Sequence, residues 1–87
     1  MLNLMFLPQA WEDYLYWQSE DKKMLRKINR LFDEISRTPT SGTGKPEALR
    51  ENFSGWWSRR LDGEHRIVYK VESDTLIIAQ IRFHYGN

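Results

Sequence analysis

The stretch WWSRRLDGEHRIVYKVESDTLIIAQIRFHY at residues 56–85 decides the fold, because it holds three strand-like runs in close succession. The runs are Trp56–Leu61, His65–Val71 and Leu76–Tyr85, and they are rich in β-branched and aromatic residues. Asp62-Gly63 separates the first two runs and Glu72-Ser73-Asp74 the last two, and both are turn-forming sequences. Short turns join neighbouring antiparallel strands, so this stretch predicts an antiparallel meander.

Alternation along these strands predicts one mainly apolar face and one more polar face. In the middle run the apolar face has the series His65, Ile67, Tyr69 and Val71, and the other face has Arg66, Val68 and Lys70. In the last run the corresponding series are Ile77, Ala79, Ile81 and Phe83, and Gln80, Arg82 and His84. We expect helices to cover the apolar face. Arg66 and His84 then lie on the same polar face, where they form a candidate site. Alternatively, each of these two residues is an ordinary surface residue that is solvated or salt-bridged.

The N-terminal part predicts a strand followed by a helix. Leu2–Leu7 is an apolar run that ends at Pro8, a residue favoured in the first turn of a helix. The first helix is expected at about residues 10–18, where an apolar stripe recurs at helical spacing: Trp11, Tyr14, Leu15 and Gln18. Four aromatic residues of this helix cannot all face inward, so at least one should be exposed: Trp11, Tyr14, Tyr16 or Trp17. That exposed surface is a candidate contact for a partner protein.

A second helix should follow Ser19 or Asp21, either of which is a suitable N-cap. Its stripe is the most regular in the chain: Met24, Leu25, Ile28, Leu31, Phe32 and Ile35. The sequence Arg37-Thr38-Pro39 ends it, and residues 38–52, with Gly42, Gly44 and Pro46, are expected to form a loop. Loops of this length often carry function. Two helices packed on an antiparallel sheet make an α+β fold.

Composition limits the classes of function. A chain of 87 residues with 40% hydrophobic content is expected to form a single globular domain, residues 1–87. Cys is absent, which excludes disulfides, thiolate metal sites and a cysteine nucleophile, and favours the cytoplasm. The N-terminus does not read as a signal peptide, and no run approaches membrane-spanning length. The net charge is only +1, from 13 basic and 12 acidic residues, so any RNA-binding site must be local.

Several segments together resemble a known family. WEDYLYWQ, ISRTP, GKPEAL, FSGWWSRRL, EHRIVYKV and RFHY are similar to YoeB/Txe toxins of the RelE/ParE superfamily, and the resemblance spans residues 1–85. It implies a RelE-like fold, with two N-terminal helices packed on a twisted antiparallel sheet. It also implies a toxin of a type II toxin-antitoxin system, which cuts messenger RNA in the ribosomal A site. The implied partners are a cognate antitoxin of the YefM, Axe or Phd kind, the 70S ribosome and its message, and a homodimer remains open.

The resemblance also carries individual catalytic residues. Glu47 of GKPE corresponds to the general base, Arg66 of EHRIVY to the phosphate-stabilising arginine, His84 to the general acid and Tyr85 to a terminal aromatic residue. RNA cleaves itself once a base removes the 2′-OH proton and an acid protonates the departing 5′-oxygen. A guanidinium stabilises the extra negative charge that forms between these steps. Glu47 has the alternative of capping a helical turn, and Tyr85 that of closing the core.

Four basic residues near the site in the sequence are candidates for binding RNA phosphates: Lys45, Arg59, Arg60 and Arg82. Solvated surface charges are the alternative. Two histidines without Cys or an acidic cluster make no credible metal site, so we expect neither a metal nor another cofactor. His65 has the parity of the apolar face and is expected to be a structural histidine with a hydrogen-bond partner.

Two other classes of function share this fold: a ParE-like inhibitor of DNA gyrase, and a non-enzymatic binding module. The fold alone does not separate them from a nuclease. The nuclease requires Glu47, Arg66 and His84 to converge, and neither alternative does.

Overall fold

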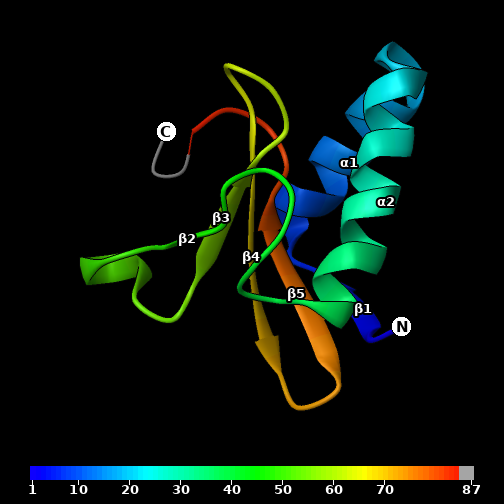
Figure 1. Cartoon of the computed structure of the whole chain (residues 1–87). Coiled ribbons are helices and arrows are strands. Elements are labelled where there is room, and N and C mark those ends of the chain that lie inside the picture. Colours follow the sequence, from blue (N-terminus) through cyan, green and yellow to red (C-terminus); the bar gives the residue numbers. More distant parts are fainter. Residues whose placement is uncertain (85–87) are drawn as a thin grey trace.

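The computed structural model describes residues 1–84, and Figure 1 shows two helices lying on one side of a five-stranded sheet. The elements in chain order are β1 (Asn3–Phe6), α1 (Pro8–Glu20), α2 (Lys22–Arg37), β2 (Glu47–Ala48), the 3₁₀ helix η1 (Glu51–Phe53), β3 (Trp57–Arg60), β4 (Arg66–Glu72) and β5 (Thr75–Gln80). The strand order across the sheet is β1-β5-β4-β3-β2. Within the described residues, no helix has both the length and the apolar character needed to cross a membrane.

The sheet is antiparallel from β2 to β5, and β1 joins its other edge as a parallel partner of β5. The expected α+β fold, with two helices packed on a twisted sheet, is confirmed, and the parallel edge pair is an addition to it. Asn3 lies opposite Thr75 and Phe6 opposite Ile78 in the register. A parallel pair needs a long connection and has no turn sequence to announce it. The N-terminal strand was therefore predicted, but its parallel pairing with β5 was not.

Helix α2 forms as the sequence predicts. Asp21 is its N-cap, and its Oδ1 accepts a hydrogen bond from the Met24 N–H at 3.1 Å. This bond satisfies one of the backbone donors left free at a helix start. The helix buries one face against the sheet, made of Ile28, Leu31, Phe32 and Ile35. Four of the six residues of the predicted stripe are therefore in the core.

The buried face of α1 differs from the predicted stripe. Asp13 and Trp17 are buried, whereas Trp11 is 48% exposed and Leu15 is 44% exposed. Both buried residues bind the backbone where the sheet ends. Asp13 Oδ2 accepts a hydrogen bond from the Ile81 N–H at 2.8 Å, and Trp17 Nε1 donates one to the Ile81 carbonyl at 2.9 Å. Asp13 faces inward and supplies the acceptor that the buried Ile81 N–H needs, because buried backbone groups require hydrogen-bond partners.

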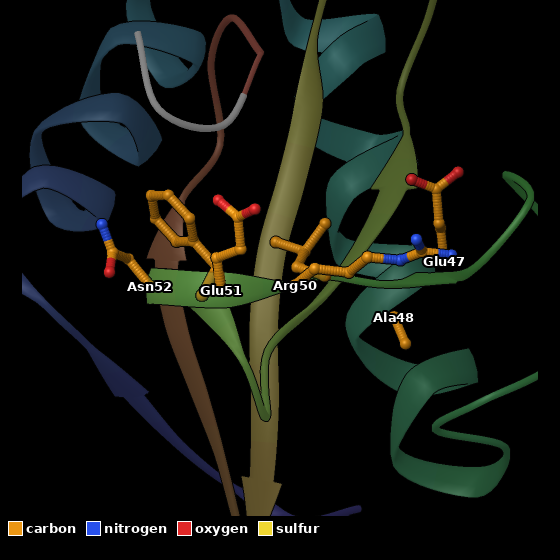
Figure 2. Close-up of a pocket in the computed structure, with 7 residues that line it drawn as sticks. Glu47, Ala48, Arg50, Glu51 and Asn52 are labelled. Atoms are coloured by element: carbon orange, nitrogen blue, oxygen red, sulfur yellow. The ribbon is translucent and has the colours of Figure 1, made fainter.

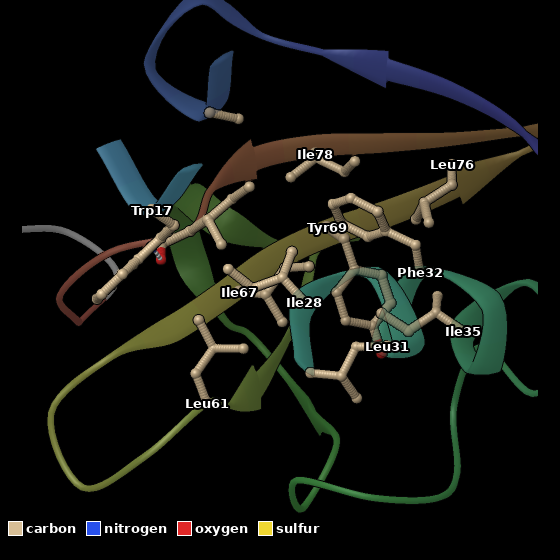
Figure 3. Close-up of a cluster of buried hydrophobic side chains, with 12 residues drawn as sticks. Trp17, Ile28, Leu31, Phe32, Ile35, Leu61, Ile67, Tyr69, Leu76 and Ile78 are labelled. Carbon is tan, nitrogen blue, oxygen red and sulfur yellow. Dashed lines mark hydrogen bonds between the residues drawn. The ribbon is translucent and has the colours of Figure 1, made fainter. Parts of the chain in front are cut away.

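The core fills the space between α2 and the helix-facing side of the sheet (Figure 3). Tyr69 and Ile67 of β4 lie at its centre, as alternation predicted, and both are fully buried. The remaining members of this cluster come from all parts of the chain: Ala10, Trp17, Ile28, Leu31, Phe32, Ile35, Leu61, Leu76, Ile78 and Ile81. Because this cluster covers one face of the sheet from β5 to α2, only the opposite face is left for the candidate site.

The predicted face of the last strand is wrong except at one position, because β5 contains an irregularity. The predicted series was Ile77, Ala79, Ile81 and Phe83. Instead, Leu76 and Ile78 face the core together with Ile81, and Phe83 is exposed. The register pairs Tyr69 with Ile78 but the neighbouring Val68 with Gln80, so Ala79 is an extra residue. One extra residue of this kind reverses the parity of everything after it.

Candidate active site

A cavity of about 210 Å³ lies on the sheet face opposite the core, since its residues Arg60 and Arg66 have the opposite parity to the buried pair Arg59 and Ile67. Its lining comes from four separate segments of the sequence: Lys45 and Glu47, Ser58 and Arg60, Arg66, and His84. The structure therefore brings together Glu47, Arg66 and His84, three of the expected catalytic residues. Lys45 and Arg60, two of the candidates for binding RNA phosphates, also line it, and their role stays a prediction. Tyr85 lies outside the described residues.

Glu47 begins the short strand β2 and is exposed to solvent. Its register partner is Ser58 of β3, which sequence reasoning missed and which contributes a hydroxyl to the same cavity. Glu47 also borders a neighbouring cavity of about 600 Å³, lined by residues 47–53. Figure 2 shows Glu47 at one end of this row and Asn52 at the other, with the Arg50 side chain extending in the direction of Glu47. Arg50 was not predicted either, and it adds a cationic side chain to the lining of this neighbouring cavity.

Arg59 corrects one prediction, because it is fully buried and does not line the cavity. It is the hub of a buried network that fastens the loop at residues 38–46. The guanidinium binds the Glu34 carboxylate, and Nε donates to the Tyr69 hydroxyl at 3.0 Å. Its other N–H groups donate to the loop carbonyls of Thr38, Ser41 and Thr43. A buried charge needs such partners, so Arg59 is a structural residue with no free donor face for RNA.

The same network shifts two pKa values. Burial would raise the pKa of Glu34, but hydrogen bonds from the Thr43 hydroxyl and N–H and the charge of Arg59 outweigh it, so the pKa falls below 4.5. Burial raises the pKa of Tyr69 above 10.0, against the lowering effect of Arg59. Tyr69 therefore keeps its proton, and its hydroxyl donates a hydrogen bond to the Pro39 carbonyl at 2.7 Å.

Beyond this network, the loop turns sharply toward the cavity. Gly44 has φ +90°, and its carbonyl accepts a hydrogen bond from the Arg60 N–H at 2.7 Å. A Cβ at Gly44 would lie 2.8 Å from the Arg60 carbonyl oxygen, so only glycine fits here. Lys45 follows with φ +53°. The close approach to β3 delivers Lys45 and Glu47 to the cavity.

Arg66 begins β4 and is held at one edge of its guanidinium. Nη1 donates to the carbonyls of Asp62 and His65, each at 3.0 Å. The turn before it is ordered by Asp62 Oδ1, which accepts hydrogen bonds from the Glu64 and His65 N–H groups at 2.8 and 2.7 Å. Burial would raise the pKa of Asp62, but these two backbone bonds lower it. Arg66 therefore meets the cavity in a defined orientation.

His84 lies in the segment 81–84, beyond the end of β5 at Gln80, and not on a strand as predicted. The backbone is irregular here, because Phe83 has φ +59°. A left-handed conformation costs roughly 1–2 kcal/mol for a residue with a side chain. His65 compensates: its Nδ1 accepts a hydrogen bond from the Phe83 N–H at 2.8 Å. The prediction that His65 is a buried structural histidine with a hydrogen-bond partner is confirmed.

Arg82, another candidate for binding RNA phosphates, does not line the cavity, and its RNA-binding role stays a prediction. Its guanidinium carbon lies 3.6 Å from the centre of the Tyr16 ring and 4.7 Å from that of the Phe83 ring. These cation–π contacts occupy the side chain. Tyr16 is itself 37% exposed. Arg82 therefore links the segment 81–84 to α1.

The cavity combines a carboxylate, an imidazole, a hydroxyl and three cationic side chains. Such a set fits a phosphodiester, because the cations bind the anion while the carboxylate and imidazole flank it as potential base and acid. In the part of the chain that the structure describes, no three His, Cys, Asp or Glu side chains are grouped as metal ligands.

Known proteins share this sequence and fold. Residues 6–85 match the model of the YoeB-like toxins of bacterial type II toxin-antitoxin systems. The chain is 51% identical to toxin YoeB of Escherichia coli over 97% of this chain and 100% of that one.

Solved structures agree with the sequence comparison. A YoeB/ParE toxin from Agrobacterium tumefaciens is 44% identical, with a TM-score of 0.93 over 97% of this chain and 100% of that one. YoeB in a heterotetrameric YoeB-YefM complex from Staphylococcus aureus is 49% identical, with a TM-score of 0.90 over 98% and 99%. A YoeB dimer from the same species is 49% identical, with a TM-score of 0.90 over 97% and 98%. The chain therefore belongs to the family of YoeB-like toxins of bacterial type II toxin-antitoxin systems.

Proposed function

We propose that this toxin is a metal-independent endoribonuclease that cuts messenger RNA in the A site of the ribosome and so stops translation. The observation that carries the proposal is the shared cavity of Glu47, Arg66 and His84. These side chains come from β2, β4 and the segment after β5. A gyrase inhibitor or a binding module has no need for a base, a cation and an acid around one small cavity.

Each group has a role in the proposed reaction. Glu47 takes the proton of the ribose 2′-OH, whose oxygen then attacks the adjacent phosphorus. Arg66 stabilises the extra negative charge on the phosphorane, and Lys45 and Arg60 bind its oxygens. His84 gives a proton to the departing 5′-oxygen. The products are a 2′,3′-cyclic phosphate on one fragment and a 5′-OH on the other, and the role of Tyr85 stays a prediction.

The proposed partners follow from the family. A YefM-like antitoxin binds and suppresses the toxin, as the staphylococcal YoeB-YefM complex suggests by analogy. The ribosome presents the message, and the place of action is the cytoplasm. A dimer like the staphylococcal one is part of the proposal for the free toxin.

The test is cleavage of a programmed message on purified ribosomes. We expect a message with one 2′-deoxy nucleotide at the scissile position to bind but remain uncut, because Glu47 then has no hydroxyl to activate. Fragments from the normal message should end in a cyclic or 3′-phosphate and a 5′-OH, and chelators should not slow the cut once ribosome assembly is secured by other means. Fragments with a 5′-phosphate, or cutting of the deoxy message, would sink the mechanism. Gyrase inhibition without new message ends would favour the ParE-like alternative.

Variants assign the roles in the same assay. Glu47→Gln and His84→Gln should each slow cleavage by roughly a hundred to ten thousandfold, the range for a positioned base or acid. Arg66→Ala should cost about a hundredfold or more. Glu12→Gln, a matched change on the exposed part of α1, should leave the rate unchanged.

A further inference from the structure

The segment 81–84 places His84 without the support of a regular strand. β5 ends at Gln80, and the left-handed Phe83 directly precedes His84. Strained backbone of this kind persists only when surrounding contacts hold it. Asp13 and Trp17 hold Ile81, which leaves the question of what holds the backbone near the imidazole.

Gln80 supplies those contacts from the last position of β5. Its Nε2 lies 2.6 Å from the Arg82 carbonyl oxygen, 2.7 Å from that of His84 and 3.3 Å from that of Phe83. Carbonyl oxygens only accept hydrogen bonds, so their convergence requires the nitrogen end of the carboxamide here. Its two N–H groups match the two short contacts. The side chain thus closes the segment into a compact turn.

A second set of bonds comes from the start of β4. His65 Nδ1 accepts from the Phe83 N–H at 2.8 Å, and the Arg66 N–H donates to the Phe83 carbonyl at 3.0 Å. These bonds fix Phe83 relative to Arg66. The Gln80 bond to the His84 carbonyl extends the same control one residue further, to the backbone that carries the candidate acid.

We infer that Gln80 is a positioning residue for His84: its carboxamide holds the His84 backbone so that the imidazole faces Glu47 and Arg66 across the cavity. The inference rests on the proposed function, in which His84 is the general acid. Gln80 contacts neither substrate nor reacting atoms and acts only through His84. Proton transfer is sensitive to the placement of the acid, and small displacements cost large factors in rate.

The first test uses Gln80→Met, which keeps the length of the side chain and removes its donors. We expect the single-turnover rate on programmed ribosomes to fall between about tenfold and a hundredfold. Ribosome binding, measured by co-sedimentation, and the midpoint of thermal unfolding should stay close to native. Gln18→Met, on the exposed face of α1, is the matched control and should change none of these. A native cleavage rate in Gln80→Met, or a rate loss fully explained by unfolding, would overturn the inference.

A second variant gives a readout that a merely structural role would not move. In Gln80→Glu, an ionised carboxylate faces carbonyl oxygens and repels them, whereas a protonated carboxyl donates one hydrogen bond. The ratio of the Gln80→Glu rate to the native rate should therefore rise as the pH falls toward the usual glutamate range of about 4.3. A ratio that stays flat with pH contradicts the role assigned to the carboxamide donors.

Amide hydrogen exchange separates this inference from the proposed function. Exchange at Phe83 and His84 should be faster in Gln80→Met than in the native toxin and unchanged in Gln18→Met. If the native toxin cuts no RNA, the proposed function fails, while the exchange data still decide whether Gln80 holds the segment. If the native toxin cuts RNA and exchange is unaltered by Gln80→Met, the inference fails by itself.

Discussion

The two segments that bring the candidate base and acid to the cavity are held in opposite ways. The loop at residues 38–46, which leads to Glu47, depends on one buried charged residue, Arg59, with five partners. The segment 81–84, which carries His84, is held by separate side chains that each make one or a few hydrogen bonds: Asp13, Trp17, His65 and Gln80. Substituting Arg59 therefore removes five hydrogen-bonding contacts at once, whereas substituting one side chain of the second set removes only one or a few. The placement of Glu47, the proposed base, therefore depends on a contact that also stabilises the fold, whereas the placement of His84, the proposed acid, depends on local contacts.

The largest effect should come from removing the hub. Arg59→Met leaves the half-buried Glu34 carboxylate and several loop carbonyls without their donor, and the loss should approach the cost of breaking a buried ion pair, about 3–5 kcal/mol of unfolding free energy. Urea denaturation measures the loss, and cleavage should fall with it because the loop no longer holds Glu47. The control is Arg37→Met, whose pair with Asp33 joins side chains that are 67% and 52% exposed. Losing that exposed pair should lower the unfolding free energy by less than about 1 kcal/mol. An equal loss in both variants would break the comparison.

Charge at the hub gives a smaller and pH-dependent effect. Glu34→Gln should lower the unfolding free energy by about 1.5–3 kcal/mol, the range for hydrogen bonds to charged groups. Because the folded state lowers the pKa of Glu34 below 4.5, this stabilisation is complete above that pH and is lost as the pH falls through the folded value. The stability difference between native and Glu34→Gln protein should narrow below pH 4.5. A difference independent of pH would mean that the carboxylate charge is irrelevant.

The smallest effect on stability should come from the distributed set. His65→Phe keeps the edge-to-face contact with Trp17, at 4.9 Å between ring centres, and removes the acceptor of the Phe83 N–H. We expect a cost of about 1 kcal/mol and faster amide exchange at Phe83. Combined with Gln80→Met, the two rate losses should be non-additive, since both changes act on one segment. A loss as large as that of Arg59→Met would show that this segment also has a hub.

Alternation along β3 could have separated Arg59 from Arg60, which were predicted together as RNA-binding residues. Trp57, Arg59 and Leu61 share one parity, and the two apolar neighbours belong to the core side of β3. Arg59 lies opposite Ile67 and Arg60 opposite Arg66. Parity therefore separates the buried arginine from the one at the cavity. Grouping the two by sequence proximity lost that information.

Other errors had no local signal. The extra residue Ala79 in β5 depends on pairing with β4, so the sequence of β5 alone does not reveal the change of face. Asp13 looks like an ordinary polar residue of an amphipathic helix until its backbone partner at Ile81 is known. The convergence of Glu47 with Arg66 and His84 came from family resemblance, because alternation related only the last two. Local patterns predicted the elements and the antiparallel meander, whereas the approach of Glu47 to Arg66 and His84 came only from the family resemblance.

The parallel pair of β1 with β5 also sets an order in time. β1 is synthesised before every other element of this domain, yet its partner strand β5 is made only after both helices and three other strands. Until then β1 has no strand to pair with. The backbone of Ile81, to which Asp13 and Trp17 form hydrogen bonds, is also not yet synthesised. Pairing between such distant segments is slow to form because a long loop must close first. While residues 57–84 still occupy the exit tunnel, the nascent chain has neither a complete sheet nor a cavity that contains His84. The candidate active site is therefore incomplete during this stage of synthesis.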